Sequence, residues 1–414
     1  MSHCPILIVM NAKCLLTLVL AHLTFSAIEH SSERLQIALT SNCELRKLYK
    51  EHIESHVYLR SPDEIKRRMM ILREEIRTVL TLRENKAIKW HAGINLMADM
   101  TPAEKKLMKG ASNTTANKKS LNMKLNNSEQ NLQQKRSTFS KHPPHFDGWR
   151  KGGWIGAVKR QGQKRADCWA HAAIVPIEAQ LAYEKQGPLV ELSVQELYDC
   201  TYPKLTYKEL ENEGGLVSDA WDYIAKTGRL TDEKHAPYTG REWQRWVPGS
   251  TMGRICKKKN YLGDTTRFPN MLEGYVATRT KAANSDEDLF EYLYCYSPVT
   301  VSVDSTKSNL EQYKGPNCLE KPFKPAEECS NEDTDHAMVV VGYSEKSYII
   351  RNSWGYKFGV DGYVYWDRTG EKCGLFKRAW AQLLERKDRK NPGYQRAKHG
   401  HLRKHQRIAV FFDR

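Results

Sequence analysis

Two short apolar runs constrain the fold most, because each carries a polar residue at one end. His336 precedes the run Met338–Val341, and Asn352 follows the run Tyr348–Ile350. Apolar runs of this length, rich in Val and Ile, predict buried β-strands. If the strands are neighbours, His336 and Asn352 lie side by side at one edge of a sheet. An amide that fixes the tautomer of an imidazole prepares it to act as a general base.

A cysteine far upstream is a candidate nucleophile for such a base. Cys168 opens a stretch in which Ala173, Ile177 and Leu181 follow at helical spacing. The N-terminus of a helix favours the thiolate, and a neighbouring imidazolium lowers the pKa of the thiol further. Gln161 lies where its side-chain amide and the Cys168 backbone N–H would stabilise an oxyanion. A cysteine before a helix is often inert, but the order Gln, Cys, His, Asn favours a catalytic one.

These motifs and their order resemble the papain-like cysteine peptidases, the cathepsin family, over about Asp63–Leu375. The resemblance implies that Cys168 is the nucleophile and that His336 is its base and acid. Asn352 would orient the imidazole, and Gln161 would contribute to the oxyanion hole. It also implies an α+β fold with two lobes, of which the first is mainly helical and the second is an antiparallel, barrel-like sheet.

The resemblance further implies a substrate-binding cleft between the lobes. By the resemblance, Gly214 and Gly215 would bind the peptide backbone, and Trp354 would cover the His–Asn pair. The pocket for the second residue before the scissile bond would be lined by Leu216, Val217, Ser302 and Ala337. Arg378 matches the floor of that pocket, where it would favour an acidic substrate residue. Because the similarity weakens after Leu375, we expect Arg378 to face water instead.

The chain divides into five parts. We expect a signal peptide (1–27), an inhibitory propeptide (28–109), a polar linker (110–141), a papain-like peptidase domain (142–380) and a basic extension (381–414). Lys13 and the apolar run Cys14–Ala21 suit a cleaved signal for a secreted or lysosomal/endosomal protein. A membrane-spanning signal anchor is the alternative, and the shortness of the run argues against it. No other run is long and apolar enough to span a bilayer.

The propeptide assignment rests on a charged helical region. Glu64 and Arg68 lie four residues apart, and Gly93–Asp99 resembles an element of cathepsin L-type propeptides, with Met97 in place of Phe. The propeptide would inhibit its own peptidase domain, whose substrates would be proteins or peptides. An amphipathic regulatory helix of another kind is the alternative.

The linker lacks large apolar residues and carries processing signals. Asn113 and Asn126 begin glycan acceptor sequences that are used only if the chain is secreted. Lys135–Arg136 is a dibasic site, and we expect the mature N-terminus between Lys135 and His145.

The cysteines show one departure from the family. By position the resemblance implies two disulfides, Cys200 with Cys256 and Cys329 with Cys373, which suit an oxidising compartment. Arg165 and Asn212 occupy the positions of a third family disulfide, and the loop from Gln161 to Cys168 is one residue longer than usual. The remaining cysteines of the mature region, Cys295 and Cys318, either pair or stay free. No metal-ligand spacing is present, so we expect neither a metal nor a cofactor.

Two helix residues also depart from the family. Pro176 lies within the helix after Cys168, where a kink is expected. His171 replaces the usual Phe; we expect a half-buried side chain, with a catalytic role as the alternative.

Half of the net charge of +16 lies in the C-terminal extension, which has ten basic and two acidic residues from Arg386 onward. Such a tail would contact polyanions, or it is a solvated extension. The sequence as a whole therefore predicts a cysteine endopeptidase made as a zymogen. A catalytically impaired binding protein with the same fold is the alternative.

Overall fold

The computed structural model describes residues 31–56, 60–111, 142–162, 165–202, 214–239, 256, 268–279, 282–315, 322–325, 329–370 and 372–387. Several predictions concern residues outside these ranges: the signal peptide, Asn113, Asn126, Lys135–Arg136, Asn212, Cys318 and nearly all of the basic extension. The described residues include no helix that is long and apolar enough to cross a membrane. The chain forms two compact units, one of residues 1–85 and 92–100 and one of residues 86–91 and 101–414.

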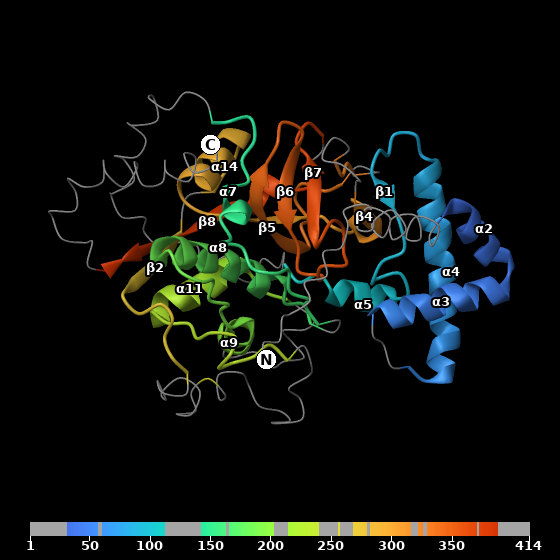
Figure 1. Ribbon diagram of the computed structural model, residues 1–414, viewed down its shortest axis with the longest axis horizontal. Coiled ribbons are helices and arrows are strands. Elements are labelled where there is room, and N and C mark those ends of the chain that lie inside the picture. Colours follow the sequence, from blue (N-terminus) through green and yellow to red (C-terminus); the bar gives the residue numbers. More distant parts are fainter. Residues whose placement is uncertain are drawn as a thin grey trace, which may run out of the picture. The chain divides into compact units, whose positions relative to one another are not determined.

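Three helices build the first unit: α2 (Ser32–Thr40), α3 (Asn42–His56) and α4 (Pro62–Glu84) (Figure 1, blue). Ser61 caps α4, because its side chain accepts a hydrogen bond from the Glu64 N–H, and Pro62 occupies the first turn, where its missing N–H costs nothing. The helices bury a shared apolar core made of Leu35, Leu45, Leu48, Leu72, Ile76 and Val79.

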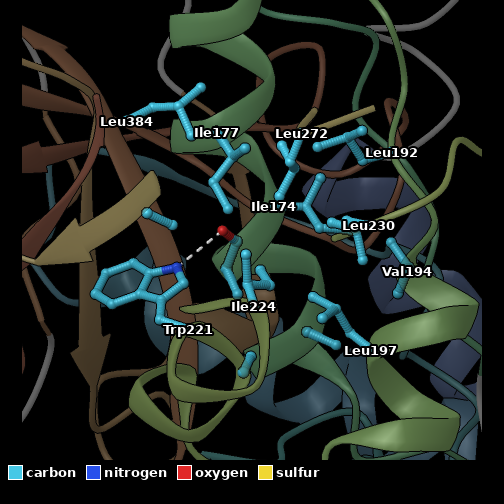
Figure 2. Close-up of a cluster of buried hydrophobic side chains, with 14 of the residues drawn as sticks. Ile174, Ile177, Leu192, Val194, Leu197, Trp221, Ile224, Leu230, Leu272 and Leu384 are labelled. Atoms are coloured by element: carbon cyan, nitrogen blue, oxygen red, sulfur yellow. Dashed lines mark hydrogen bonds between the residues drawn. The ribbon is translucent and has the colours of Figure 1, made fainter. Parts of the chain in front are cut away.

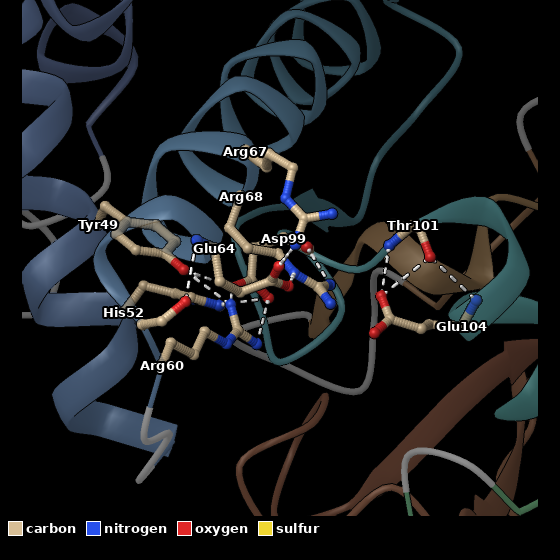
Figure 3. Close-up of polar contacts among 10 residues, drawn as sticks. Tyr49, His52, Arg60, Glu64, Arg67, Arg68, Asp99, Thr101 and Glu104 are labelled. Atoms are coloured by element: carbon tan, nitrogen blue, oxygen red, sulfur yellow. Dashed lines mark hydrogen bonds and ion pairs between the residues drawn. The ribbon is translucent and has the colours of Figure 1, made fainter.

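A buried carboxylate holds the Gly93–Asp99 element to these helices (Figure 3). Asp99 pairs with Arg60, and its carboxylate lies 3.2 Å from both the Tyr49 hydroxyl and the His52 Nε2. The Arg68 guanidinium donates to the Asp99 carbonyl at 2.8 Å and pairs with Glu64, as the helical spacing of the two residues predicted. The burial of the Asp99 carboxylate is tolerated because Arg60, Tyr49 and His52 all contact it.

The helical part of the second unit packs around α8 (Cys168–Lys185), with α9 (Val194–Cys200) and α11 (Val217–Thr227) against it. Figure 2 shows the core between them, where the Trp221 indole N–H also donates to the Ala173 carbonyl at 3.0 Å. The opposite face of α8 packs on the sheet through Ala172 and Val175. The helix is therefore buried on both sides, and it continues past Pro176 without ending.

Six antiparallel strands form the sheet in the order β2-β8-β3-β5-β6-β7. Their bounds are β2 Tyr275–Arg279, β3 Val299–Val303, β5 His336–Tyr343, β6 Ser347–Arg351, β7 Tyr363–Asp367 and β8 Trp380–Arg386. The α+β class is confirmed, but the described strands leave β2 and β7 as open edges, so the expected barrel-like closure is not formed among them. Strand β8 crosses the domain boundary expected at residue 380, because it pairs with β2 up to Arg386.

The other elements of the described residues are mostly short. They are β1 (His91–Ala92), α5 (Pro102–Leu107), α7 (Gly148–Lys151), α14 (Asp286–Cys295), η5 (Leu310–Gln312), β4 (Tyr313–Gly315) and η6 (Leu375–Arg378). Two disulfides are formed, Cys200–Cys256 and Cys329–Cys373. Cys295 forms no disulfide with any described cysteine.

Candidate active site

The imidazole and the amide meet at the edge of the sheet, where sequence analysis expected them. His336 begins β5 and Asn352 directly follows its neighbour β6, and the His336 Nε2 lies 2.8 Å from the Asn352 Oδ1. The same oxygen accepts the Ser353 N–H at 2.7 Å, so Nε2 is the donor. The ring therefore keeps Nδ1 as its basic nitrogen, and the Trp354 indole stacks on it with 4.5 Å between ring centroids.

The thiol lies beside this pair at the first turn of α8. The Cys168 Sγ accepts a hydrogen bond from the backbone N–H of Ala337, the residue after His336, at 3.4 Å. Burial raises the pKa of the Cys168 thiol to about 12. Burial also lowers the pKa of His336 to about 4, although the hydrogen bond with Asn352 acts in the opposite direction. In this state the thiol and the imidazole are therefore both neutral.

The Gln161 amide is held in place and already binds a carbonyl oxygen. Its Oε1 accepts from the Ser353 hydroxyl at 2.6 Å, which leaves Nε2 to donate to the Met108 carbonyl at 3.0 Å. The Trp354 indole N–H donates to the same carbonyl at 3.1 Å. Two donors thus converge on one backbone oxygen.

That oxygen belongs to the segment Thr101–Ala111, which we call the cleft segment. It begins with α5, whose capping box joins Thr101 and Glu104 (Figure 3). At its other end the Gly215 N–H donates to the Gly110 carbonyl at 2.8 Å, and Ala111 pairs with Gly215 in parallel orientation. Gly110 and Ala111 thus belong to this segment, and the boundary expected between propeptide and linker at residue 109 does not interrupt it.

Glycine is required where the cleft segment crosses the nucleophile. A Cβ on Gly110 would lie 2.2 Å from the Ala166 carbonyl oxygen, and a Cβ on Gly214 would lie 2.2 Å from the Gly110 oxygen. Gly214 also has a φ of +66°, which favours glycine. Both approaches are backbone to backbone, so no side-chain movement would relieve them.

Most of the residues expected to bind substrate line one pocket. Its lining includes Ala111 of the cleft segment and, from the remainder of the unit, Gly215, Leu216, Val217, Ser218, Thr300, Val301, Ser302, Arg378 and Trp380. Ala337 is not part of this lining and contacts the thiol instead. The expectation that Arg378 faces water is wrong: η6 and the following strand β8 keep the chain against β3, and the half-buried Arg378 side chain is turned to the pocket.

A buried ionic network lies directly before the nucleophile. The Arg165 guanidinium lies 3.5 Å from the Asp167 carboxylate, which accepts the Tyr238 hydroxyl at 2.7 Å. The same hydroxyl accepts the Gly162 N–H at 2.7 Å. His171 is fully buried rather than half-buried, since its ring packs edge-on against Tyr238, and burial lowers its pKa well below the ordinary value.

Three residues of this region were not predicted from the sequence: Asp167, which precedes the thiol, and Lys109 of the cleft segment, which pairs with Glu311. The one sequence feature that could have indicated a role for Asp167 is its position directly before the nucleophile. This feature is not specific, because Asp335 likewise directly precedes His336. Among the described residues, no group of His, Cys, Asp and Glu side chains is suited to hold a metal ion.

Comparisons with known proteins identify the family of this chain. The family model for papain family cysteine protease matches residues 142–383. Cathepsin 7 of Rattus norvegicus is 29% identical over 346 residues, which are 78% of this chain and 88% of that protein. Thiol protease SEN102 of Hemerocallis sp. is 27% identical over 383 residues, 88% of this chain and 93% of that protein. Procathepsin L of Felis catus is 29% identical over 57% of this chain and 64% of its own length.

A solved structure shares the fold. The digestive procathepsin L2 proteinase from the larval midgut of Tenebrio molitor superposes with a TM-score of 0.63 at 24% identity, over 82% of this chain and 99% of that chain. The fold and the thiol–imidazole–amide site define a cysteine-type endopeptidase in its zymogen form. The chain belongs to the papain family of cysteine proteases.

Proposed function

We propose that the processed protein hydrolyses peptide bonds with Cys168 as the nucleophile. Cys168 Sγ passes its proton to His336 Nδ1 and attacks the substrate carbonyl carbon. The oxyanion that forms accepts hydrogen bonds from the Gln161 amide and the Cys168 N–H. The imidazolium, oriented by Asn352, returns the proton to the leaving amine, and water then hydrolyses the thioester. The observation that carries this proposal is the Met108 carbonyl, which accepts a hydrogen bond from Gln161 Nε2 at 3.0 Å.

The cleft segment supports the proposal that the protein is a zymogen, because the segment would inhibit the reactive groups in two ways. It fills the cleft, and its burial of Cys168 and His336 favours the neutral forms of both groups. Removal of the segment admits water, which lowers the pKa of the thiol and raises that of the imidazole. Both changes favour the reactive thiolate–imidazolium pair.

The pocket beside Gly215 would select the second residue before the scissile bond. Its apolar lining of Leu216 and Val217 suits an aliphatic stem, and the Arg378 guanidinium attracts a carboxylate. We therefore propose that Glu or Asp is favoured at this position. Burial lowers the pKa of Arg378, yet an arginine remains charged at any pH of interest.

The second candidate is a papain-fold binding protein with impaired catalysis. The feature that favours it is the Arg165–Asp167 pair next to the oxyanion donors, in which Arg165 stands at the position where the resemblance implies a half-cystine. The test is to process the purified protein and treat it with a thiol-directed epoxide. Labelling of Cys168 together with peptide hydrolysis supports the peptidase, whereas a folded, processed protein that stays unlabelled supports the alternative.

We also propose that the protein acts in the secretory or endosomal–lysosomal system. Two disulfides in the peptidase domain support an oxidising compartment. Contact of the basic extension with polyanions stays a prediction, because its residues lie almost entirely outside the described ranges.

A further inference from the structure

A lysine of the cleft segment lies in a polar cradle next to the catalytic histidine. The Lys109 ammonium lies 2.6 Å from the Thr306 hydroxyl, pairs with Glu311, and lies 3.9 Å from the Asp335 carboxylate. Only 7% of the Lys109 side chain is exposed. Three acceptors thus surround an ammonium group that has three hydrogens to donate. We call Thr306, Glu311 and Asp335 the cradle.

The cradle is built by the peptidase domain and does not depend on Lys109 for its shape. Asp335 accepts the Ser305 N–H at 2.8 Å and the Ser305 hydroxyl at 2.7 Å, and it also accepts the Thr306 hydroxyl. Glu311 is set on η5, next to the fully buried Leu310. Burial alone would raise the pKa of Glu311, but the ammonium groups of Lys109 and Lys105 outweigh it and lower that pKa. The site therefore favours a cation next to an ionised carboxylate.

The cradle and the Arg378 pocket lie on opposite sides of the nucleophile. Gly110 lies next to the nucleophile, because its N–H donates to the Asp335 carbonyl at 3.0 Å and a Cβ on it would lie 2.2 Å from the carbonyl oxygen of Ala166, two residues before Cys168. The residue before Gly110 fills the cradle, and the residue after it lines the Arg378 pocket. A peptide cleaved at Cys168 would therefore place residues from the two sides of its scissile bond in these two sites.

We infer that the cradle is a substrate site for a lysine side chain on the leaving-group side of the scissile bond. The inference rests on the proposed function, because that function assigns the Arg378 pocket to the acyl side. When the cleft segment leaves, Lys105 and Lys109 leave with it, and the Glu311 and Asp335 carboxylates remain. A substrate ammonium would restore their pairing, whereas a substrate carboxylate would be repelled.

The first test measures binding without catalysis. A labelled peptide of residues 101–111 is titrated into processed Cys168→Ala protein by fluorescence anisotropy. We expect Lys109→Gln in the peptide to weaken binding about tenfold or more, because Glu311 then loses the more deeply buried of the two ammonium groups that pair with it. The matched control is Lys106→Gln, which makes the same charge change at an exposed position outside the cradle. Equal affinity of the Lys109→Gln and parent peptides would overturn the inference.

The second test measures selection by the active enzyme. Quenched fluorescent peptides carry Lys, Arg, Leu or Glu at the first or the second position after the scissile bond. At one of these two positions, we expect kcat/KM to be at least roughly tenfold higher for the Lys peptide than for the Glu peptide. The Glu311→Gln variant should lose most of this preference for Lys. Glu332→Gln, which removes an exposed carboxylate of the same unit, should leave the ratio unchanged.

Failure of the inference is distinct from failure of the proposed function. If no peptide is cleaved, the proposed function fails and the anisotropy test still decides whether the cradle selects lysine. If cleavage occurs but the preference for Lys is missing or survives Glu311→Gln, the inference fails alone. Thr306→Val serves as a second variant if Glu311→Gln does not fold, and it should reduce the Lys preference by removing one acceptor.

Discussion

The Arg165 guanidinium lies over the ring of Tyr198, with its central carbon 3.7 Å from the ring centroid. A cation is thereby buried three residues before the nucleophile, at the position where the resemblance leads one to expect a half-cystine. The guanidinium lies 3.5 Å from the Asp167 carboxylate, which accepts a hydrogen bond from the Tyr238 hydroxyl. That hydroxyl in turn accepts the N–H of Gly162, which lies in the loop between Gln161 and Cys168. Noncovalent pairing thus connects the same stretch of chain that a disulfide would hold.

Arg165→Met should destabilise the protein by about 3–5 kcal/mol, because it leaves the Asp167 carboxylate buried next to an apolar side chain. Equilibrium unfolding in urea of the Cys168→Ala proenzyme measures the loss. The exposed Lys151→Met is the control and should change stability by less than about 0.5 kcal/mol. A loss as small as that of the control would mean that the pair does not stabilise the fold.

Asp167 should make stability depend on pH. Burial raises the pKa of Asp167 to about 6, although Arg165 and the Tyr238 hydroxyl oppose the shift. The folded state then binds the proton more tightly than the unfolded state does, so stability falls as pH rises from about 4 to about 6, by up to roughly 3 kcal/mol. Asp167→Asn in the Cys168→Ala proenzyme should remove this part of the slope. An unchanged slope would contradict the assignment.

Acidification should release the cleft segment through Glu311, whose lowered pKa stabilises docking at neutral pH. That stabilisation is lost as pH falls below the ordinary carboxyl value of about 4.3 and towards the pKa of the docked state. The wild-type proenzyme should therefore stay intact at pH about 7 and shorten once the pH falls below about 4, as gel electrophoresis would show. Glu311→Gln should shorten at higher pH than the wild type, and a proenzyme that is already active and uncut at neutral pH would refute inhibition.

Asn352→Ala should keep some turnover, whereas Cys168→Ala should lose all hydrolysis. The amide orients the imidazole but does not react, so we expect kcat to fall by roughly 10²- to 10⁴-fold while KM changes little. Epoxide labelling of Cys168 should persist in Asn352→Ala at a lower rate. Full activity of Asn352→Ala would exclude an orienting role.

Arg378→Ala should abolish discrimination in favour of an acidic second residue before the scissile bond. A peptide library that varies only this residue measures the effect, and Leu should gain relative to Glu in the variant. If a preference for Asp or Glu survives Arg378→Ala, the pocket has been assigned wrongly.

Local sequence patterns predicted the helices and strands whose formation depends mainly on neighbouring residues in the chain. The apolar runs after His336 and before Asn352 predict adjacent strands, and the helical spacing that begins at Cys168 predicts α8. Residues whose roles depend on distant contacts could not be predicted in this way. Asp167 and Arg165 meet Tyr198 and Tyr238 only after folding, and nothing near Lys109 in the sequence indicates that it lies against Glu311.

The position of the Arg378 side chain could not be predicted from nearby residues either. Its exposure depends on where β8 pairs, and β8 pairs with β2 and β3, which lie about eighty to a hundred residues earlier in the chain. The open edges of the sheet are likewise a property of the strand order, which the strands' own sequences do not encode.

The close approach at Gly110 has a genetic consequence. Any side chain there would collide with the Ala166 backbone, yet Gly110 precedes the expected mature N-terminus and would be absent from the processed enzyme. A missense change at this codon should therefore leave the enzyme itself intact while weakening its latency. Such an allele would be dominant, because premature proteolysis by one gene product is not corrected by a normal second copy.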